Sequence, residues 1–552
     1  MDHCRVGRRP RSAAVLVATI ITGEALAVLV ACLALSAGSA VWAAVVAGIL
    51  VGALPFARFG GRPVLSWAEN GWRYLRDTRP DSGRTVDFRA PGQSVGLHWS
   101  GGQVLAVVEL IPPSRSLTRI TREGFDSPGQ LPVTTLAQCL EQHDVTLSGI
   151  DVLSHGRRSA PGIPAADVYD TLIGPLPAIA QRSVWVVLRF DAADNAASVA
   201  RRGGGEEGAS RTVTVAATRI VRAIADAGCH SRILTASEIE AVAARLSHGV
   251  SPADMGQEWS HVPTPGAHNV GNAIDPRRLT RELLAAVWAA PGLDTTVAIH
   301  LRPGRASQSV RVGATFRRTT RTLPGRLGLR GLVSMQGRHR DGLLSQLPTA
   351  PPELDGIAPM TEVDPRTLDA LCLPVSGCGQ LIGSDSDGHA VSARITGPGV
   401  SNVHVAGELY LAQQIVFRAV ATGARILIHT DRPHAWAPLV DAVATPDLLR
   451  IAGGPAWSDT GSWSDTGFDT ILLDGIGAPP ARAGVTTIHL SSDPGLRLSA
   501  TTDVSIVQPG AGGDRVVLTA GEHRVELVLV TIPSETAFIG RPRSATRLAP
   551  AR

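Results

Sequence analysis

The stretch AAVLVATIITGEALAVLVACLAL, residues 13–35, decides the fold class because it is apolar over a length that crosses a bilayer. At about 1.5 Å of rise per residue, these 23 residues span roughly 34 Å as a helix. A second apolar run, AVWAAVVAGILVGALPF at 40–56, follows a short break, which forces the two helices to lie antiparallel. A signal peptide has a shorter apolar region, of about 7–15 residues, and a cleavage site follows it. The sequence therefore predicts a transmembrane hairpin at 13–57.

Arginines flank the predicted hairpin on both sides. They are Arg5, Arg8, Arg9 and Arg11 before it, and Arg58, Arg62, Arg73 and Arg76 after it. The positive-inside rule places such flanks in the cytoplasm. We therefore expect a multi-pass protein of the plasma membrane with a basic cytoplasmic N-tail at 1–12, and with everything after residue 57, including the C-terminus, in the cytoplasm.

Small residues recur at every fourth position on both predicted helices. They are Thr19, Gly23, Ala27 and Ala31 on the first helix, and Ala40, Ala44, Gly48 and Gly52 on the second. Such stripes let helix backbones approach closely where lipid supplies no hydrophobic drive. We expect these residues to pack within the hairpin or against partner subunits.

Glu24 is the ionisable residue of the spans, and at mid-helix it costs about 3 kcal/mol on insertion scales. It either contacts another subunit's helix or a polar path, or it stays protonated inside the bundle. After the hairpin, Trp67, Trp72 and Tyr74 stand beside two arginines, which is typical of an interfacial segment and is expected here for 58–90.

The composition describes a globular body and excludes several chemistries. Of the 552 residues, 44% are hydrophobic and 18% charged, which allows several folded domains. The net charge is only +4, so we expect no nucleic-acid partner. All 52 basic side chains are arginine, so mechanisms that need a lysine amine are excluded. The six cysteines lack zinc-site spacing and are expected to be reduced.

Strand and helix patterns alternate from about residue 91. Strands are expected at 95–99, 104–110, 149–153 and 183–190, and helices at 136–143, 168–173 and 206–227. This alternation predicts an α/β core with a mixed sheet at 91–250.

A glycine-rich break, RRGGGEEG at 201–208, precedes the longest of these helices. Glycines before a helix N-terminus can hold an anion, and arginines favour it. The candidate partner or anion contacts are therefore Arg201, Arg202, Gly203, Gly204 and Gly205. Glu206 and Glu207 would repel an anion and instead complement the helix dipole, which makes a plain connection the stronger interpretation.

Several segments resemble one known family. They are the hairpin, VGLHW at 95–99, LSGIDVLSHG at 147–156, GPLP at 174–177, and RFD at 189–191 continuing through Asn195 to the glycine-rich break. Over about residues 10–245 they are similar to EccE, the membrane component of actinobacterial type VII (ESX) secretion systems. The resemblance implies a translocon subunit whose partners are EccB, the EccC ATPase, EccD, the mycosin and membrane lipid. It establishes no catalytic activity.

The next region, 251–370, combines Pro- and Gly-rich linkers with an arginine-rich middle. Nine arginines lie between 305 and 340, and Arg317, Arg318 and Arg321 are candidate contacts among them. A single aromatic residue, Phe316, is too little for a nucleic-acid groove. An acidic patch on a partner, anionic lipid headgroups or a solvated strand face explain the arginines better.

The last block has the layout of a nucleotide-binding βαβ unit. Strands are expected at 401–407, 424–429, 470–474 and 485–490, with helices at 408–421 and near Trp436 and a closing hairpin at 514–532. The connection Ala406-Gly407-Glu408-Leu409 lacks the lysine and hydroxyl of a phosphate loop and puts an acid there. We predict a degenerate nucleotide-binding-like domain at 371–535, used for packing, and an Arg- and Pro-rich tail at 536–552.

Two aspartate pairs keep an enzymatic alternative open. Asp191 and Asp194 follow a strand, whereas Asp385 and Asp387 lie in the turn-like GSDSDG at 383–388. With a divalent metal, either pair could serve a membrane-tethered glycosyltransferase-like enzyme. Because neither completes a catalytic constellation, we expect a non-enzymatic subunit without catalytic, cofactor or metal residues. A third hypothesis is a scaffold that docks anionic lipid or acidic partners through 305–340.

Overall fold

The computed structural model describes residues 11–539 with several gaps. The gaps are 54–55, 60–61, 64–66, 68–69, 73, 76–82, 123, 128, 307–308, 352–353, 355–356, 453–466, 478–481, 494–500 and 511–512. For 11–19, 58–59 and 62–63 only the backbone is described. The expectations for the arginines before residue 11, for Arg73 and Arg76, and for the tail beyond 539 lie outside the described residues.

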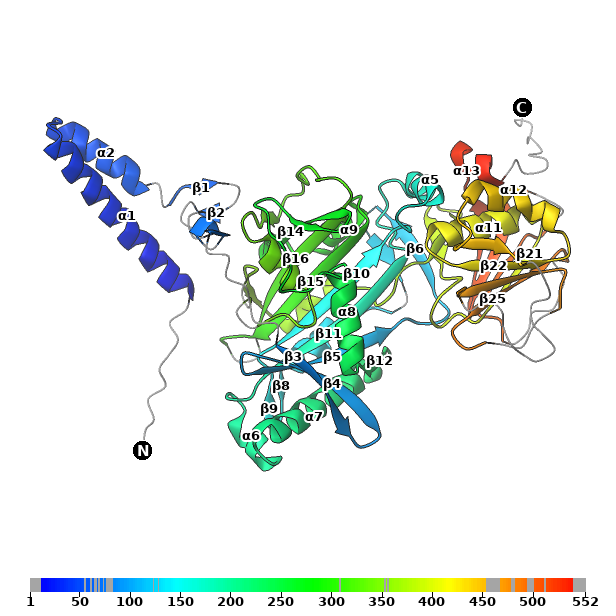
Figure 1. The fold of residues 1–552 in the computed structure, drawn as a ribbon, viewed down its shortest axis with the longest axis horizontal. Helices are drawn as coiled ribbons and strands as arrows, with labels where there is room; N and C mark the ends of the chain where they lie inside the picture. Colours follow the sequence, from blue (N-terminus) through cyan, green and yellow to red (C-terminus); the bar gives the residue numbers. More distant parts are fainter. Residues whose placement is uncertain are drawn as a thin grey trace.

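Two packed helices, α1 (Arg11–Ser36) and α2 (Val41–Ala53), stand apart from the rest of the molecule (Figure 1). Gly38 reverses the chain between them with a φ of 81°, a conformation that glycine adopts without strain. The predicted antiparallel helix pair is therefore present. Within the described part of the chain, none of the helices combines the length and the hydropathy of a membrane span. A small ribbon, β1 (Arg58–Phe59) with β2 (Arg62–Pro63), leads toward the body.

A twelve-stranded sheet forms the middle of the molecule. Its main order is β13-β14-β16-β15-β10-β11-β5-β4-β3, with β12, β17 and β18 pairing at its margins. The strands are β3 (Arg84–Ala90), β4 (Gln93–Ser100), β5 (Gln103–Ile111), β10 (Gly149–Arg157), β11 (Gln181–Asp191), β12 (His230–Ile233), β13 (Val262–Thr264), β14 (Ala267–Ile274), β15 (Asp294–Pro303), β16 (Val310–Thr320), β17 (Leu332–Ser334) and β18 (Thr361–Val363).

Every pairing between the described strands of this first sheet is antiparallel, which corrects the expected mixed sheet. The strands are antiparallel because short turns connect neighbouring strands. The Gly101–Gly102 turn between β4 and β5, for example, is too short to join parallel strands. The helices α4 (Val133–Gln138), α7 (Gly205–Asp226) and α9 (Arg281–Ala289) cover one face with an apolar core. The opposite face packs against α8 (Ala236–Leu246) and α10 (His339–Leu344).

A second twelve-stranded sheet lies at the C-terminal end (Figure 1). Its order is β23-β22-β24-β25-β21-β26-β27-β28-β19-β20-β6-β7, and the strands from β23 to β26 are parallel. The strands are β6 (Leu117–Thr121), β7 (Gly124–Asp126), β19 (Gln380–Ser384), β20 (Ala390–Ala393), β21 (Asn402–Ala406), β22 (Ile426–Thr430), β23 (Leu449–Ile451), β24 (Thr470–Asp474), β25 (Thr486–Ser491), β26 (Val504–Val507), β27 (Arg515–Ala520) and β28 (His523–Leu529). The helices α5 (Pro164–Ile173), α11 (Leu409–Ala421), α12 (Pro433–Val443) and α13 (Pro533–Ile539) pack on it. The parallel strands agree with the expected βαβ layout, whereas the pairings from β26 through β27, β28, β19, β20 and β6 to β7 are antiparallel.

The two sheets exchange segments. Strands β6 and β7 come from between two strands of the first sheet but pair at the edge of the second. Backbone bonds from Ala160 N to Ala421 O (2.7 Å) and from Cys378 N to Ile179 O (2.8 Å) join the sheets elsewhere. Arg182 of β11 adds a cation–π contact, since its guanidinium carbon lies 4.2 Å from the ring centroid of Trp288 and 5.0 Å from that of Phe125.

Two sequence expectations differ from these elements. The beginning of the region 251–370, where a linker is expected, instead contains β13 and β14, because β13 pairs with β14 and β14 pairs with β16. The helix expected at 136–143 ends at Gln138 in α4. It gives way to a small hairpin of β8 (Glu141–Gln142) and β9 (Val145–Thr146), whose turn holds His143 at a φ of 48°. Short helices α6 (Ala196–Arg201), η2 (Pro276–Arg278) and η4 (Pro365–Leu371) complete the described elements.

Candidate functional site

The helix pair α1–α2 is built on glycine contacts. A Cβ at Gly48 would lie 2.8 Å from Ala27 O, one at Gly52 would lie 2.9 Å from Ala27 Cβ, and one at Gly23 would lie 2.9 Å from Gly52 O. Real Cβ atoms do not approach so closely, so only glycine allows this helix separation. The structure thus brings together Gly23, Ala27, Gly48 and Gly52, and Ala44 is buried beside them.

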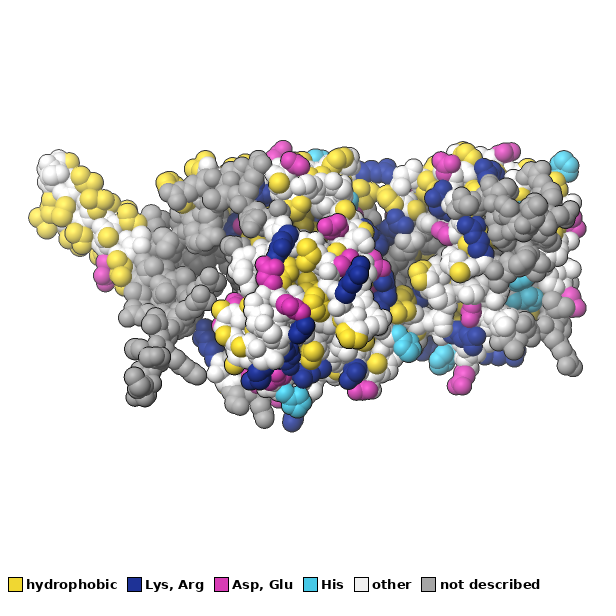
Figure 2. All heavy atoms as spheres, turned by 60° about the horizontal axis from the view of Figure 1, so that its bottom comes forward, with side chains coloured by type: hydrophobic (Ala, Val, Ile, Leu, Met, Phe, Trp, Pro, Cys, Tyr) yellow, Lys and Arg dark blue, Asp and Glu magenta, His cyan; other side chains and the backbone are white. Residues whose placement is uncertain are grey.

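The outward faces of the same helices are apolar. Trp42 is 74% exposed, and Ile49 and Leu50 are 65% and 66% exposed. Figure 2 shows hydrophobic side chains covering the described part of the pair, whereas the face of the body seen there mixes both charges. Glu24 is exposed, so within this chain it does not lie between the two helices.

The segment after the hairpin contacts the body through aromatic side chains. The ring centroids of Trp67 and Trp259 are 6.2 Å apart, and the Tyr74 ring meets Trp259 edge-on at 5.5 Å. Asn70 Nδ2 donates to Gln336 O at 3.5 Å. Trp259 was not singled out by sequence reasoning, because it stands in a stretch whose composition indicates a linker.

The arginine-rich region is not one solvated surface. Arg317 and Arg318 are only 1% and 7% exposed, which corrects the interpretation of this run as a solvated strand face. Arg317 Nη2 donates to Thr296 Oγ1 at 3.0 Å, in the interior next to Asp294. Arg321 is exposed on the loop that follows β16. Arg317 is buried because side chains point alternately to the two faces of a strand, and this alternation directs Arg317 toward the face of the sheet that α8 and α10 cover.

Two cavities adjoin the loop 321–330. One, of about 710 Å³, is lined by Trp67, Arg318 and Arg326 among others. The other, of about 510 Å³, shares Arg318 and Arg326 and adds Arg321, Asp167 and Asp170. We call the first of these the Arg318 cavity.

At the glycine-rich break the arginines already have an anionic partner. Arg201 Nη2 lies 3.2 Å and Arg202 Nη1 2.8 Å from Asp144 Oδ2, and Arg219 approaches the same carboxylate. The bond from Arg202 holds the pKa of Asp144 well below its usual range. Asp144 was missed by sequence reasoning, since it lies far from these arginines along the chain.

The glycines themselves turn the chain. Gly203, Gly204 and Gly205 have φ values of 111°, 71° and 54°, a left-handed run between α6 and α7 that other residues rarely adopt. Arg84 Nη2 lies 2.6 Å from Glu206 Oε1, so an acid of the first turn is also paired. The break therefore has a structural explanation in the chain reversal.

The nucleotide-like end of the second sheet is filled by the chain's own side chains. Gln508 Oε1 accepts a bond from Glu408 N at 3.0 Å, where a phosphate loop would cradle its ligand. Gln508 Nε2 donates to Gly513 O at 2.6 Å. A Cβ at Gly407 would lie 2.7 Å from Gln508 Oε1.

Asp474, at the end of β24, is also hydrogen-bonded to side chains of the same chain. Arg432 Nε and Nη2 donate to its two oxygens at 2.8 and 2.7 Å, and Trp436 Nε1 donates at 2.8 Å. Burial raises the pKa of Asp474, but the bonds from Arg432, Trp436 and Thr430 outweigh it and lower that pKa. This carboxylate is thus satisfied by its neighbours in the fold.

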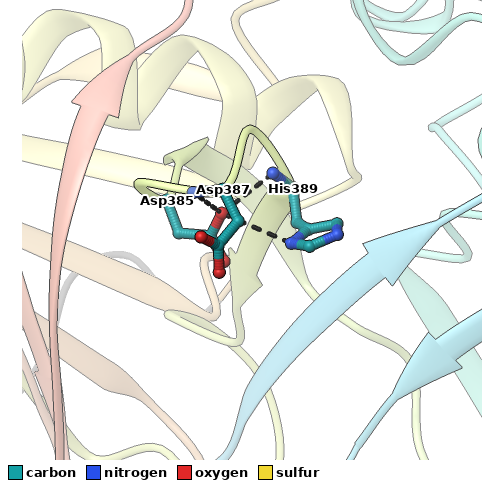
Figure 3. Close-up of side chains that lie close together, drawn as sticks. All are labelled: Asp385, Asp387 and His389. Carbon is teal, nitrogen blue, oxygen red and sulfur yellow. Dashed lines mark hydrogen bonds and ion pairs between the residues drawn. The ribbon is translucent and has the colours of Figure 1, made fainter.

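The Asp385, Asp387 and His389 side chains lie together at the β19–β20 turn (Figure 3). Asp385 Oδ1 accepts bonds from the backbone N–H groups of Asp387 (3.1 Å) and His389 (2.9 Å), and its Oδ2 lies 2.8 Å from Arg119 Nε. The carboxylate therefore closes a turn and pairs with a cation of β6. At the other pair, Asp191 Oδ1 accepts a bond from Ala193 N at 2.9 Å, and Asp194 is exposed.

A buried ionic cluster in the first sheet was also missed by sequence reasoning. Asp151 lies 2.5 Å from Arg189 Nε, 2.7 Å from Arg302 Nη1 and 2.8 Å from His300 Nδ1. Burial raises the pKa of Asp151, but these three groups hold it well below its usual range. The adjoining cavity measures only about 10 Å³, room for at most one water, so the cluster is part of the core.

Comparisons with known proteins agree with the resemblance described above. Residues 178–274 match the sequence model of the family "Putative type VII ESX secretion system translocon, EccE". The ESX-1 secretion system protein EccE1 of Mycolicibacterium smegmatis is 26% identical over 398 residues, which cover 70% of this chain and 76% of that relative. The ESX-2 secretion system protein EccE2 of Mycobacterium tuberculosis is 24% identical over 538 residues, 90% of this chain and 93% of that relative. For the ESX-5 secretion system protein EccE5 of Mycobacterium marinum the identity is 25% over 266 residues, 46% of this chain and 64% of that relative. These matches confirm the resemblance to the EccE family, whose sequence model covers residues 178–274 of this chain.

Proposed function

We propose that this chain is a non-enzymatic structural subunit of the type VII (ESX) secretion membrane complex. In this proposal the helix pair is inserted in the plasma membrane, and the two-sheet body is a cytoplasmic scaffold beside the other translocon components. The names of the relatives support a translocon role, and the helix pair supports the anchor.

The observation that carries the proposal is the inverted packing of α1 and α2. Small residues fill their contact, whereas Trp42, Ile49 and Leu50 point away from it and are largely exposed. In water, each exposed side chain of this size lacks the stabilisation of about 1.5–3 kcal/mol that burial would provide. In hydrocarbon the same arrangement costs nothing, and close glycine contacts supply the helix association.

The arginines at both flanks give the orientation. Arg11 begins α1, and Arg58 follows the second helix. By the positive-inside rule both flanks stay on the cytoplasmic side, and so does the body.

Glu24 supports a contact with another subunit. It is exposed on α1, so the hairpin alone does not shield it. An acid facing lipid is costly, whereas a helix of a neighbouring subunit can supply a hydrogen-bonding partner. We propose EccB, the EccC ATPase, EccD and the mycosin as the proteins with which the chain assembles.

A scaffold role for the body is supported by its polar side chains at positions typical of an active site, because these side chains are already bonded to other residues of the same chain. Asp474 is held by Arg432 and Trp436, Asp385 by Arg119, and Gln508 occupies the position of a phosphate loop's ligand. Each group stabilises the fold, so we assign the body to binding partners and not to catalysis.

The test uses the full chain with a C-terminal tag, expressed in an actinobacterial host that lacks its own copy. We expect the tag to stay in the membrane pellet after alkaline extraction and to resist protease added outside intact cells. We also expect it to migrate with the secretion complex after mild detergent extraction, and a deletion to abolish secretion and shrink that complex. Removal of the tag by external protease, or an unchanged complex after deletion, would contradict the proposal.

A further inference from the structure

The Arg318 cavity combines a basic site with apolar walls. Its volume of about 710 Å³ lies within the usual range for ligand pockets. Arg318 and Arg326 line it, and none of the described residues around it is an aspartate or glutamate. The walls include the apolar side chains Trp67, Leu323 and Leu327.

Arg318 lacks a counter-ion among the described residues. It is 7% exposed, and its guanidinium donates only to carbonyl groups, to Gly325 O at 3.0 Å and to Pro291 O at 3.5 Å. Its Nε is buried and has no partner among the described atoms. Burial lowers the pKa of Arg318, as expected where a cation is desolvated. A buried charge without a counter-ion is costly, and an anion in the cavity would compensate the charge of Arg318.

The rim of the cavity is both basic and apolar. Leu323 is 53% exposed and stands between exposed Arg321 and Arg326. From 295 to 340 the sequence contains arginines but no aspartate or glutamate. A leucine flanked by arginines is typical of a segment that contacts a membrane surface.

The cavity also lies close to the hairpin along the chain. Trp67, one of its walls, follows Phe56, the end of the second apolar run, within a segment that reaches at most about 40 Å. A lipid headgroup at the cytoplasmic surface is therefore within reach of the cavity.

We propose that the Arg318 cavity binds an anionic phospholipid, with the phosphate at Arg318 and Arg326 and the acyl chain along Leu323, Leu327 and Trp67. This inference rests on the membrane anchoring proposed above. An acidic segment of a partner protein would satisfy the arginines equally, but the apolar walls and the exposed leucine favour a lipid.

The test measures lipid retained by the full chain in a mild neutral detergent. Phosphatidylglycerol or phosphatidylcholine with the same acyl chains is added, and native mass spectrometry counts the bound lipids. We expect phosphatidylglycerol to be retained about five-fold more strongly for each arginine that contacts it. Arg326→Gln, which changes an exposed side chain, is expected to lose about that factor, and Arg318→Gln with Arg326→Gln to lose more. Arg222→Gln, on the exposed face of α7, is the matched control and should retain the lipid.

Three outcomes would overturn the proposal. They are equal retention of the two lipids, unchanged retention by Arg326→Gln, and complete displacement of phosphatidylglycerol by equimolar inorganic phosphate or polyglutamate, which would assign the cavity to a free anion or an acidic protein segment. Alkaline extraction separates this inference from the anchor. If the chain and its variants stay in the membrane while lipid preference is absent, only the cavity assignment fails, whereas release of the unmodified chain contradicts the anchor itself.

Discussion

The helix pair α1–α2 and the first sheet bury opposite kinds of side chain. The helices meet through Gly23 and Gly48 and expose large apolar groups, whereas the sheet encloses the ionic cluster of Asp151 and its arginines within an apolar core. The polar groups buried in the sheet are stable because they are paired, whereas the large apolar side chains on the outer faces of the helices are not covered by any described part of this chain. The comparison separates a region that buries paired polar groups from one that leaves large apolar side chains uncovered, and this difference underlies the membrane insertion proposed for the helix pair.

The largest expected effect is in the buried cluster. Asp151→Ala would leave Arg189 and Arg302 buried without their counter-charge, which costs about 3–5 kcal/mol of unfolding free energy. Denaturant unfolding of the full chain in mild detergent, followed by tryptophan fluorescence, measures it. Asp226→Ala, at an exposed position of α7, is the control and should stay within about 0.5 kcal/mol. Equal stability of the two variants would contradict the role of the cluster.

The second effect concerns the helix pair. Gly48→Leu places a side chain where even a Cβ would lie 2.8 Å from Ala27 O, and such overpacking costs about 1–3 kcal/mol. We expect faster hydrogen exchange of the α2 backbone in detergent, measured by mass spectrometry. Ala25→Leu on the exposed face of α1 should leave that exchange unchanged. Equal exchange in both variants would show that the glycine contact does not hold the helices together.

The third effect is a pH dependence of the body. Burial lowers the pKa of His155 to about 3, while Asp294 opposes this shift and Arg245, Arg317 and His248 add to it. Between about pH 6.5 and 3 the unfolded chain therefore binds a proton that the folded chain does not. Stability falls with decreasing pH in that window, by about 1.4 kcal/mol per pH unit for this histidine.

Unfolding measured from pH 7 to pH 5 tests this sign. His155→Asn should flatten the slope, and the exposed His523→Asn should leave it unchanged. A slope that survives His155→Asn would assign it to His248, whose pKa is also lowered by burial, or to other groups.

The smallest effect sharpens the contrast between buried and exposed ion pairs. Glu207 and Arg211 pair across one helical turn of α7 with side chains 65% and 52% exposed. Such pairs contribute at most about 0.5 kcal/mol, because water and salt screen them. Glu207→Ala should therefore change the unfolding free energy by less than about 1 kcal/mol, even with loss of its favourable place near the helix N-terminus. A cost similar to that of Asp151→Ala would break the comparison.

Local patterns predicted much of the fold. The apolar runs predicted α1 and α2, short runs of apolar and β-branched residues predicted β4, β5 and β11, and the βαβ pattern predicted the parallel half of the second sheet. The residues predicted as packing or partner contacts differ in where the structure places them. The small residues of the hairpin lie together, whereas Arg317 and Arg318 lie in the interior and Arg201 and Arg202 pair with Asp144. A run of arginines in the sequence does not reveal which of them a neighbouring element covers.

The sequence by itself determined what depends on near neighbours along the chain: the two apolar helices, the glycines that let them touch, the strand and helix periods and the absence of a phosphate-loop lysine. Only the tertiary structure decided the exchange of β6 and β7 into the second sheet, the burial of Arg318 and the occupation of the nucleotide-like end by Gln508. The strand exchange and the Gln508 contact join residues 100 or more positions apart, and Arg318 is bonded by the loops before β15 and after β16. Their free energy comes from backbone pairing and desolvation in the assembled fold, and no local pattern records it.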